Sequence, residues 1–228
     1  MKRTVQSELL DTLPPADPRA RHSRRDLRRV NAWMGNAAIM AQALSANLNG
    51  PGTSSVTEIG AGDGHFLLAV AKKLPPAGTG RTAVLLDRQN TVTPETVTVF
   101  SRLGWSARVV VRDVFDWMPG RGETVIANLF LHHFEAALLV DLFSVIARRA
   151  SLFVAIEPRR AAWPLLCSRL LWAIGCNGVT RHDAVVSVRA GFAGRELSSL
   201  WPDKTNWHLT EQSAGPFSHL FTARRITQ

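Results

Sequence analysis

Short apolar runs alternate with helical stretches along most of this chain, and this alternation constrains the fold more than any other feature of the sequence. Near-continuous apolar strands separated by helices are typical of a parallel sheet that helices cover on both faces. The pattern therefore predicts a doubly wound α/β fold. The predicted strands are 55–59, 82–87, 107–112, 123–128 and 152–157, and the predicted helices are 64–74, 94–103 and 134–149.

The C-terminal part departs from this alternation. Two strand-like runs, 207–212 and 217–223, flank the turn-like tetrapeptide Ser213-Ala214-Gly215-Pro216. Such a pair predicts a hairpin, so one of its two strands must run antiparallel to the rest of the sheet. Together with the five runs above, the hairpin gives a mostly parallel, seven-stranded sheet with an antiparallel last strand.

The N-terminal part predicts a helical extension outside this sheet. Residues 1–22 are rich in Pro, Arg and Asp and indicate a loose arm. Ser23 and Asp26 have the spacing of a capping box, and apolar residues then recur every three or four positions as far as residue 48. This spacing predicts one amphipathic helix of about six turns, which Asn49-Gly50-Pro51-Gly52 ends. We therefore expect an arm and leader helix over 1–50 and the main domain over 51–228.

The composition fits one globular domain, because 46% of the 228 residues are hydrophobic and 20% are charged. Cys167 and Cys176 cannot build a disulfide framework, and no Cys/His pattern has zinc spacing, so we expect no metal and a reducing, cytoplasmic location. The N-terminus lacks the apolar run of a signal peptide. The most hydrophobic stretch, 161–174, is too short to span a bilayer and contains Pro164 and Arg169.

The formal net charge is +9, and part of it is concentrated in Pro18–Arg29, which holds six arginines and one aspartate. A basic patch of this kind can attract nucleic acid, anionic lipid or acidic substrates. No aromatic-interleaved nucleic-acid motif accompanies the arginines. We therefore favour a solvated, arginine-rich helix start and do not expect nucleic acid as a partner.

The strongest local motif is Glu58-Ile59-Gly60-Ala61-Gly62-Asp63-Gly64, which joins the first predicted strand to the first helix. Glycines at this point allow a sharp turn and a close approach to a ligand, and the helix start offers unpaired N–H groups. A nucleotide-type ligand is expected there. The dinucleotide pattern G-x-G-x-x-G would need a glycine where His65 stands, which counts against a nicotinamide-dependent oxidoreductase.

The spacing E-x-G-x-G-x-G resembles motif I of the class I S-adenosylmethionine-dependent methyltransferases. Asp87, Asp113 and the run 128–134 stand at matching places after the second, third and fourth strands. The resemblance implies a Rossmann-like methyltransferase fold with S-adenosyl-L-methionine as the cofactor. The residues that it assigns to cofactor binding are Glu58, Gly60, Ala61, Gly62, Gly64, Asp87, Arg88, Asp113, Val114 and Asn128.

The resemblance also implies individual roles within this set. Asp87 would bind the ribose, since one carboxylate can accept from both hydroxyls of a cis-diol. Asp113 would lie near the adenine, with Asp116 as a competing candidate. Glu58 would lie near the amino-acid portion of the cofactor or order the glycine loop. The run that begins at Asn128 would lie beneath the methionine portion.

Candidate residues on the acceptor side are less defined. His132 and His133 are the first candidates for a general base, because histidine titrates near neutral pH, but such a pair can also simply line a pocket or cap a helix. His182, followed by Asp183, is a second candidate with the same alternative. The apolar stretch 161–174 would form either a lid over the acceptor or a packed core helix.

Taken together, the sequence predicts methyl transfer to a small acceptor, aromatic or lipid-like, at oxygen or carbon. The leader segment 25–35 resembles that of some small-molecule methyltransferases of this fold. One alternative is a nucleic-acid methyltransferase that uses the basic segment, although the run Asn128-Leu129-Phe130-Leu131 lacks the proline typical of amino-adenine methylases. A cofactor-binding module without catalysis is the other alternative. No oligomeric state is predicted.

Overall fold

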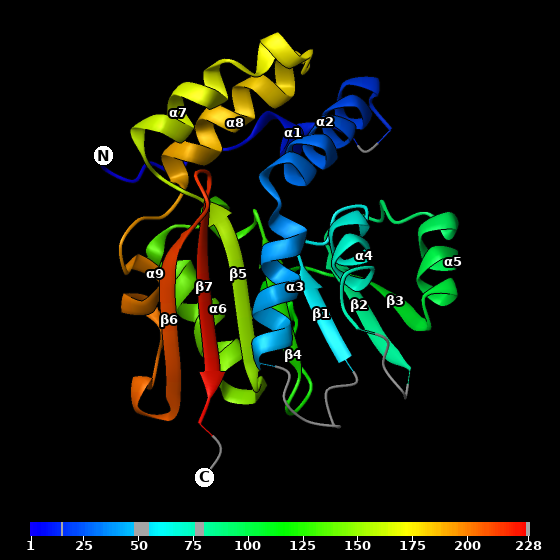
Figure 1. Ribbon diagram of the computed structural model, residues 1–228, viewed down its shortest axis with the longest axis vertical. Helices are drawn as coiled ribbons and strands as arrows, with labels where there is room; N and C mark the ends of the chain where they lie inside the picture. The colour runs from blue at the N-terminus through cyan, green and yellow to red at the C-terminus, as the bar shows by residue number, and fades with distance from the viewer. Residues whose placement is uncertain (15, 48–54, 76–79, 227–228) are drawn as a thin grey trace.

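The computed structural model describes residues 1–14, 16–47, 55–75 and 80–226 (Figure 1). One seven-stranded sheet, with the strand order β3-β2-β1-β4-β5-β7-β6, forms its centre. β7 runs antiparallel to both of its neighbours, and the other adjacent pairs are parallel. The predicted doubly wound sheet with an antiparallel last strand is therefore confirmed. The strands are β1 (Ser55–Ile59), β2 (Arg81–Asp87), β3 (Trp105–Val111), β4 (Thr124–Asn128), β5 (Leu152–Pro158), β6 (Trp207–Ala214) and β7 (Ser218–Arg225).

Helices cover both faces of the sheet, as Figure 1 shows. The strands read as continuous apolar runs because alternate side chains enter opposite cores: in β5, Val154 and Ile156 enter one, and Phe153 and Ala155 enter the other. The helices on the first face are α3 (Asn36–Asn47), α4 (His65–Ala71) and α5 (Pro94–Arg102), and those on the second are α6 (Ala136–Arg149) and α9 (Glu196–Leu200).

A third layer, which we call the cap, lies beyond the carboxyl ends of β1 and β5 (Figure 1). Both N-terminal helices of the cap pack on α8, although more than a hundred residues separate them in the sequence. Since ligands bind at the carboxyl ends of parallel strands, the cap covers the functional end of the sheet. It consists of residues 1–14 and 16–34, with α1 (Leu9–Thr12) and α2 (Pro18–Met34), and of residues 159–190, with α7 (Ala162–Arg169), the 3-10 turn η3 (Leu171–Ile174) and α8 (Gly178–Ala190).

The prediction of one continuous leader helix is wrong. Gly35 adopts the left-handed conformation with φ 71° and separates α2, which belongs to the cap, from α3, which packs on the sheet. α2 also begins earlier than predicted, because the Asp17 carboxylate caps it at the Arg19 N–H, while Ser23 is buried. The predicted stop at 49–52 and the boundary at 50/51 lie outside the described residues.

The N-terminal arm is ordered rather than loose. Thr4 donates its backbone N–H to the carbonyl of Arg189 at 3.1 Å, and the Arg3 guanidinium donates to the carbonyl oxygens of Ala190 and Phe134 at 2.7 and 2.8 Å. These bonds join the arm to the end of α8 and to the segment after β4. Because the partners are distant in the sequence, no local pattern indicates them.

The stretch 161–174 differs from both of its predicted forms. It is not a core helix, because most of its large apolar side chains are exposed, and it does not line the cavity described below. Among the described residues, no helix combines the length and apolarity needed to cross a membrane.

Candidate functional site

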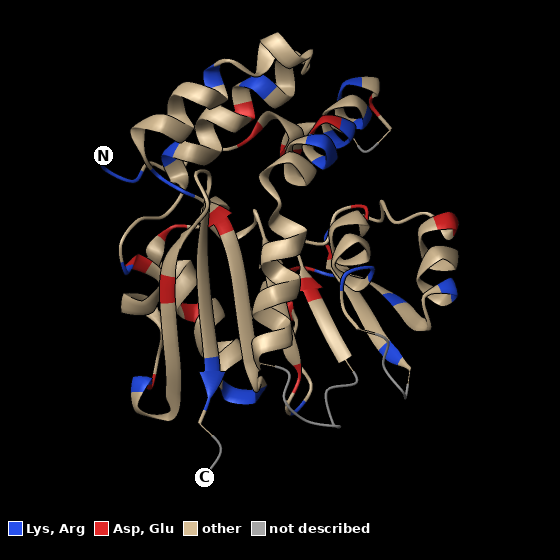
Figure 2. Cartoon of the chain, viewed as in Figure 1, with Lys and Arg blue, Asp and Glu red and all other residues tan. Residues whose placement is uncertain are grey.

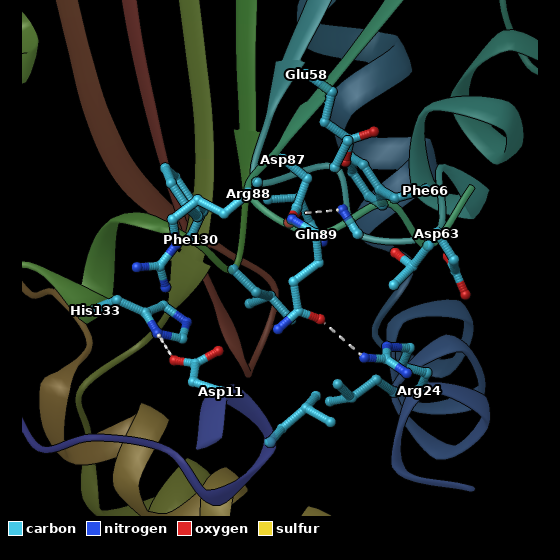
Figure 3. Close-up of a pocket in the computed structure, with 18 of the residues that line it drawn as sticks. Asp11, Arg24, Glu58, Asp63, Phe66, Asp87, Arg88, Gln89, Phe130 and His133 are labelled. Atoms are coloured by element: carbon cyan, nitrogen blue, oxygen red, sulfur yellow. Dashed lines mark hydrogen bonds and ion pairs between the residues drawn. The ribbon is translucent and has the colours of Figure 1, made fainter. Parts of the chain in front are cut away.

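A cavity of about 860 Å³ lies between the carboxyl ends of β1, β2 and β4 and the cap (Figure 3). Its volume falls within the range of small-molecule sites. Every residue predicted to bind the cofactor lines this cavity except Gly64. The fold thus brings together residues from four separate loops around one cavity.

The glycine loop enters the cavity with left-handed backbone at its first two glycines. Gly60 has φ 69°, and a β-carbon there would stand 2.2 Å from the Phe130 ring. Gly62 has φ 52° and open space where its side chain would be. Gly64, with φ 75°, is the N-cap of α4 and packs on Leu85 instead of facing the cavity. The three glycines therefore serve packing, ligand access and helix capping respectively.

Asp87 holds this loop from the end of β2. One carboxylate oxygen accepts the Gly62 N–H at 2.8 Å, and the other accepts the Gln89 N–H, also at 2.8 Å. Figure 3 shows the carboxylate in the centre of the site. A carboxylate has about four lone-pair positions, so Asp87 can accept further hydrogen bonds from a ligand.

Glu58 lies near the end of β1 and is only 2% exposed. Burial, together with the nearby carboxylates of Asp63 and Asp87, raises its pKa well above the ordinary value, although it accepts the Leu67 N–H at 3.2 Å. A buried acid of this kind is stabilised in its charged form by a cationic ligand. The loop thus presents two acidic groups, Glu58 and Asp87, to the cavity.

The segment after β3 contains both aspartates that the sequence offered as candidates for the adenine end, Asp113 and Asp116. Asp113 lines the cavity and accepts the Phe115 N–H at 3.0 Å, which starts the short 3-10 turn η1 (Val114–Asp116). Val114 is buried next to it. Asp116 is exposed and does not line the cavity. Only Asp113 is therefore in a position to contact a ligand there.

Asn128 ends β4 within a network of three asparagines. Its carbonyl oxygen accepts from Asn36 at 3.1 Å, and its amide donates to Asn31 at 3.3 Å. Asn31 lies in the last turn of α2 before Gly35, and Asn36 directly follows it. The network therefore holds the break between α2 and α3 against the end of β4. The sequence analysis did not anticipate the two partner asparagines.

The loop after β4 has an unusual backbone. Leu129 adopts φ 51°, which is rare for a non-glycine residue, and donates its N–H to Ile156 at 2.8 Å. Glu157, at the end of β5, accepts the next two backbone N–H groups, those of Phe130 and Leu131, at 3.0 and 2.8 Å. Strained backbone held by its surroundings is a mark of functional sites.

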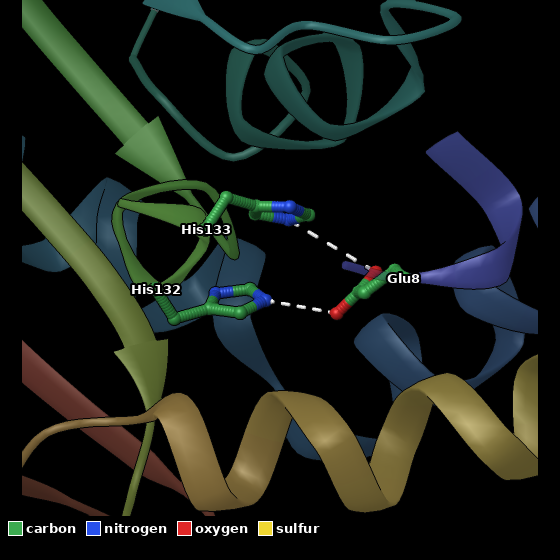
Figure 4. Close-up of side chains that lie close together, drawn as sticks. All are labelled: Glu8, His132 and His133. Carbon is green, nitrogen blue, oxygen red and sulfur yellow. Dashed lines mark hydrogen bonds and ion pairs between the residues drawn. The ribbon is translucent and has the colours of Figure 1, made fainter. Parts of the chain in front are cut away.

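His132 lies buried between two glutamates. Its Nδ1 is 2.8 Å from Glu157. Its Nε2 is 3.1 Å from Glu8 of the arm (Figure 4). Burial alone would lower the pKa of His132, but the two carboxylates outweigh it and raise the pKa to about 9. Burial likewise opposes ionisation of Glu8, and the bond and charge of His132 lower its pKa to about 2. His132 is therefore an imidazolium at neutral pH and cannot accept a proton.

His133 is half-buried and lines the cavity. Its Nδ1 lies 3.1 Å from Asp11 of α1, and its Nε2 lies 4.0 Å from Glu8. Glu8, His132 and His133 bring possible metal-ligand atoms within 4.8 Å of one another. A metal would have to displace the proton of His132, whose ring nitrogens already bond to carboxylates, so ion pairing accounts for this cluster.

The second candidate pair from the sequence lies elsewhere. His182 and Asp183 do not line the cavity. Asp183 accepts the backbone N–H groups of Leu9 and Leu10 at 2.8 and 2.9 Å and thereby caps α1. This pair fixes the arm and is not placed to act on a ligand.

Comparison with known proteins was made at the level of sequence and of structure. No protein-family model matches the sequence, and no curated protein does either. The plantazolicin methyltransferase in complex with SAH is similar in structure, with a TM-score of 0.64 at 12% identity over 92% of each chain. The magnesium protoporphyrin IX methyltransferase from Synechocystis, with bound SAH, gives 0.56 at 13% identity over 85% of this chain and 83% of that one.

The mitomycin 7-O-methyltransferase gives a TM-score of 0.64 at 19% identity, and the match covers 96% of this chain but only 61% of that enzyme. The chain has the class I methyltransferase fold. The resemblance seen in the glycine motif is thus confirmed at the level of the fold. The chain spans about three fifths of the length of several of these structures.

Several residues of the site were missed by the sequence analysis. Glu157 could have been found, because an acidic residue at the carboxyl end of a buried parallel strand is a recognisable signal. The residues from the cap have no such signal, because they reach the cavity only through contacts between distant segments. These residues are Val5, Gln6, Ser7, Glu8, Leu10, Asp11, Arg24, Leu27, Arg28, Asn31, Ala32 and Ser187.

Proposed function

We propose that this chain is an S-adenosylmethionine-dependent methyltransferase that acts on a small acceptor. The observation that carries the proposal is the glycine loop after β1, which Asp87 holds open toward a cavity at the carboxyl end of the sheet. The fold similarity to methyltransferases, among them structures with SAH, supports the same cofactor.

The residues around the cavity suit the charges of this cofactor. Asp87 can accept from ribose hydroxyls, and Asp113 with Val114 forms the adenine end. Glu58 and Asn128 flank the methionine end, where the buried acid complements the positive sulfonium and amino groups. Arg88 lines the same cavity beside Asp87.

One part of the cavity wall is aromatic, which supports an aromatic or lipid-like acceptor. The Phe115 and Phe134 rings meet edge to face at 5.3 Å, and Phe130 and Phe134 do so at 5.1 Å. Leu10 and Leu27 add apolar surface from the cap. Such a wall would hold a ring or an alkyl chain and exclude water from the site.

The cofactor supplies a methyl group that is already electrophilic, so the protein has to align the acceptor and exclude water. For a hydroxyl acceptor, we propose His133 as the base: Asp11 orients its ring, and the proton of the hydroxyl passes to an imidazole nitrogen. His132 contributes a fixed positive charge next to it. For an activated ring carbon, the acidity of the ring would replace much of the work of the base.

The structural relatives include a mitomycin 7-O-methyltransferase, and mitomycin is a small molecule. The basic helix α2 gives less support to the nucleic-acid alternative, because two of its arginines bond within the chain. Arg28 pairs with Asp63 at 2.9 Å. Arg24 donates to Gln89 at 3.2 Å, as Figure 3 shows. Both partners lie in the loops that would hold the cofactor.

Calorimetric titration with S-adenosylmethionine, S-adenosylhomocysteine and NADH tests the proposal. We expect the first two to bind, and Asp87→Ala to weaken both by about 10-fold or more through loss of charge-assisted hydrogen bonds. The matched control is Asp116→Ala, which removes an exposed carboxylate outside the cavity. Binding of NADH alone would replace the methyltransferase with an oxidoreductase, and equal binding by both variants would remove Asp87 from the site.

A further inference from the structure

Five large apolar side chains are exposed along α7 and η3. Their exposed fractions are 59% for Trp163, 49% for Leu166, 48% for Leu170, 60% for Trp172 and 52% for Ile174. We call this set the apolar strip. Exposed apolar residues are ordinary when scattered, but a cluster of this kind marks a surface that binds a partner.

The two sides of α7 have different roles. Pro164 and Ser168 are buried in the cap, whereas Trp163, Leu166 and Leu170 follow a spacing of three and four residues on the opposite side. The helix is therefore already packed on its inner side, and its outer side has no intramolecular task among the described residues. Figure 1 shows α7 at the outer edge of the cap, away from the sheet.

The surroundings of the apolar strip are basic. The segment 158–182, which contains the strip, has four arginines and neither aspartate nor glutamate. Arg169 and Arg181 are exposed. Arg29 of α2, with a side chain 60% exposed, reaches the carbonyl oxygen of Ile174 at 3.5 Å and so adjoins the strip. Figure 2 shows basic segments on α2 and on the α7–α8 pair.

We propose that the apolar strip and these arginines dock the protein on a bilayer that contains anionic phospholipids. Tryptophan prefers the interface between headgroups and acyl chains, and leucine and isoleucine gain from burial just below it. Arginines at the rim attract the anionic headgroups, each contributing about 1 kcal/mol near the surface. Arg29 also pairs with the buried Asp26 at 3.7 Å, and Arg160 is buried beside Glu196, so the exposed positive charge rests mainly on Arg169 and Arg181. The combination of an apolar stripe and these exposed arginines fits an anionic surface.

A second copy of the chain fits the same face less well. In a two-fold dimer across the strip, the same patch would meet itself. The arginine-rich rim of one copy would then face that of the other, and segment 158–182 offers no acidic residue to pair with it. Like charges across an interface are costly, so charge complementarity favours the lipid surface.

Docking would also bring the cavity near the bilayer. α2 adjoins the strip through Arg29 and contributes Leu27, Arg28 and Asn31 to the cavity wall. A lipid-like acceptor could then enter the site from the membrane. This consequence rests on the proposed function, whereas the docking itself does not.

The test is co-sedimentation of the full chain, without cofactor or acceptor, with vesicles of phosphatidylcholine alone or mixed equally with phosphatidylglycerol. We expect binding to the mixed vesicles only, and a loss of about 100-fold in Trp163→Ser/Trp172→Ser, since each buried aromatic contributes about a factor of ten. The matched control is Leu138→Ser/Val140→Ser, which removes two exposed apolar side chains of α6, at 44% and 40% exposure.

Several outcomes would overturn the proposal. They are absence of binding by the wild type, equal loss in the α6 control, and binding that does not require phosphatidylglycerol. Concentration-dependent dimerisation that the tryptophan variant abolishes, without vesicle binding, would assign the strip to a second copy. Titration of the same variants with S-adenosylmethionine shows separately whether the cofactor site is intact.

Discussion

The sheet side of the cavity, where we propose that the cofactor binds and which we call the cofactor side, is built differently from the cap side. On the cofactor side, the residues lie in or directly after the ends of strands, and most are held by an adjacent loop, as Asp87 holds Gly62; Asn128, which bonds to Asn31 and Asn36, is the exception. On the cap side, the arm, α2 and α8 come from distant parts of the chain and meet through buried carboxylates: Asp183 accepts from Leu9 and Leu10, and Asp26 accepts from Asn177.

This difference explains what each side can do. The cofactor side is fixed by backbone turns that depend on few distant contacts, which suits a ligand shared by many enzymes. The cap side depends on ion pairs and side-chain hydrogen bonds, which can vary while the sheet stays the same. We therefore expect substitutions on the two sides to affect different properties, and the variants below test this.

The largest effect is expected from Glu8→Ala. It leaves the His132 imidazolium buried with only one of its two carboxylates, and breaking a buried pair costs about 3–5 kcal/mol. We expect the arm to detach, which hydrogen exchange of the first 13 residues and denaturant unfolding would detect. The matched control is Asp11→Ala, which removes the more exposed partner of His133 and should cost about 1 kcal/mol or less. Equal losses in the two variants would contradict a special role for the buried pair.

The next effect separates two glycines of the cofactor loop. Alanine at either Gly60 or Gly62 costs about 1–2 kcal/mol for the left-handed backbone. Only at Gly60 does the new β-carbon meet the Phe130 ring, at 2.2 Å, and overpacking adds about 1–3 kcal/mol. Unfolding of the ligand-free protein should therefore show a larger loss for Gly60→Ala, which Phe130→Leu partly restores. A loss of the same size at both glycines would show that the ring moves aside freely.

The sequence predicts the cofactor side of the cavity better than the cap side. Gly60, Asp87 and Asp113 were found because strand ends and glycine spacing are local patterns. The break at Gly35 was missed because the apolar spacing continues through it. The turn is required by polar contacts between α2 and the start of α8, such as the hydrogen bond from the Asn177 N–H to Asp26 at 2.8 Å. These contacts join segments that are distant in the sequence. His132 was recognised as a titratable residue, but its charge depends on Glu8, which lies 124 residues away.

A smaller effect is expected from Glu58→Gln, and it has opposite signs for stability and for binding. The raised pKa means that wild-type stability falls as the pH rises above 4.5 toward the pKa of the buried acid, whereas glutamine has no such dependence. We expect the melting temperature of the ligand-free variant to exceed that of the wild type by about 2–4 °C at pH 8 and to match it near pH 4. Binding of S-adenosylmethionine should weaken, because the negative charge is lost. A variant that binds as tightly as the wild type would place Glu58 in a purely structural role.

The smallest effect is the pH dependence of the arm itself. His132 has its pKa raised from 6.5 to about 9, so its contribution is complete below 6.5 and is lost as the pH rises through 9. Glu8 has its pKa lowered from 4.5 to about 2, so its contribution is present above 4.5 and is lost as the pH falls toward 2. Protection of the arm amides, corrected for intrinsic exchange, should therefore be greatest between pH 4.5 and 6.5 and decline toward pH 9. In Glu8→Gln the decline in arm protection with pH should be shallower, because one of the two carboxylates that raise the pKa of His132 is gone. The amides of β4 serve as an internal reference for exchange. An arm whose protection is constant across this range would show that its backbone contacts, such as Thr4 to Arg189, hold it without the buried charges.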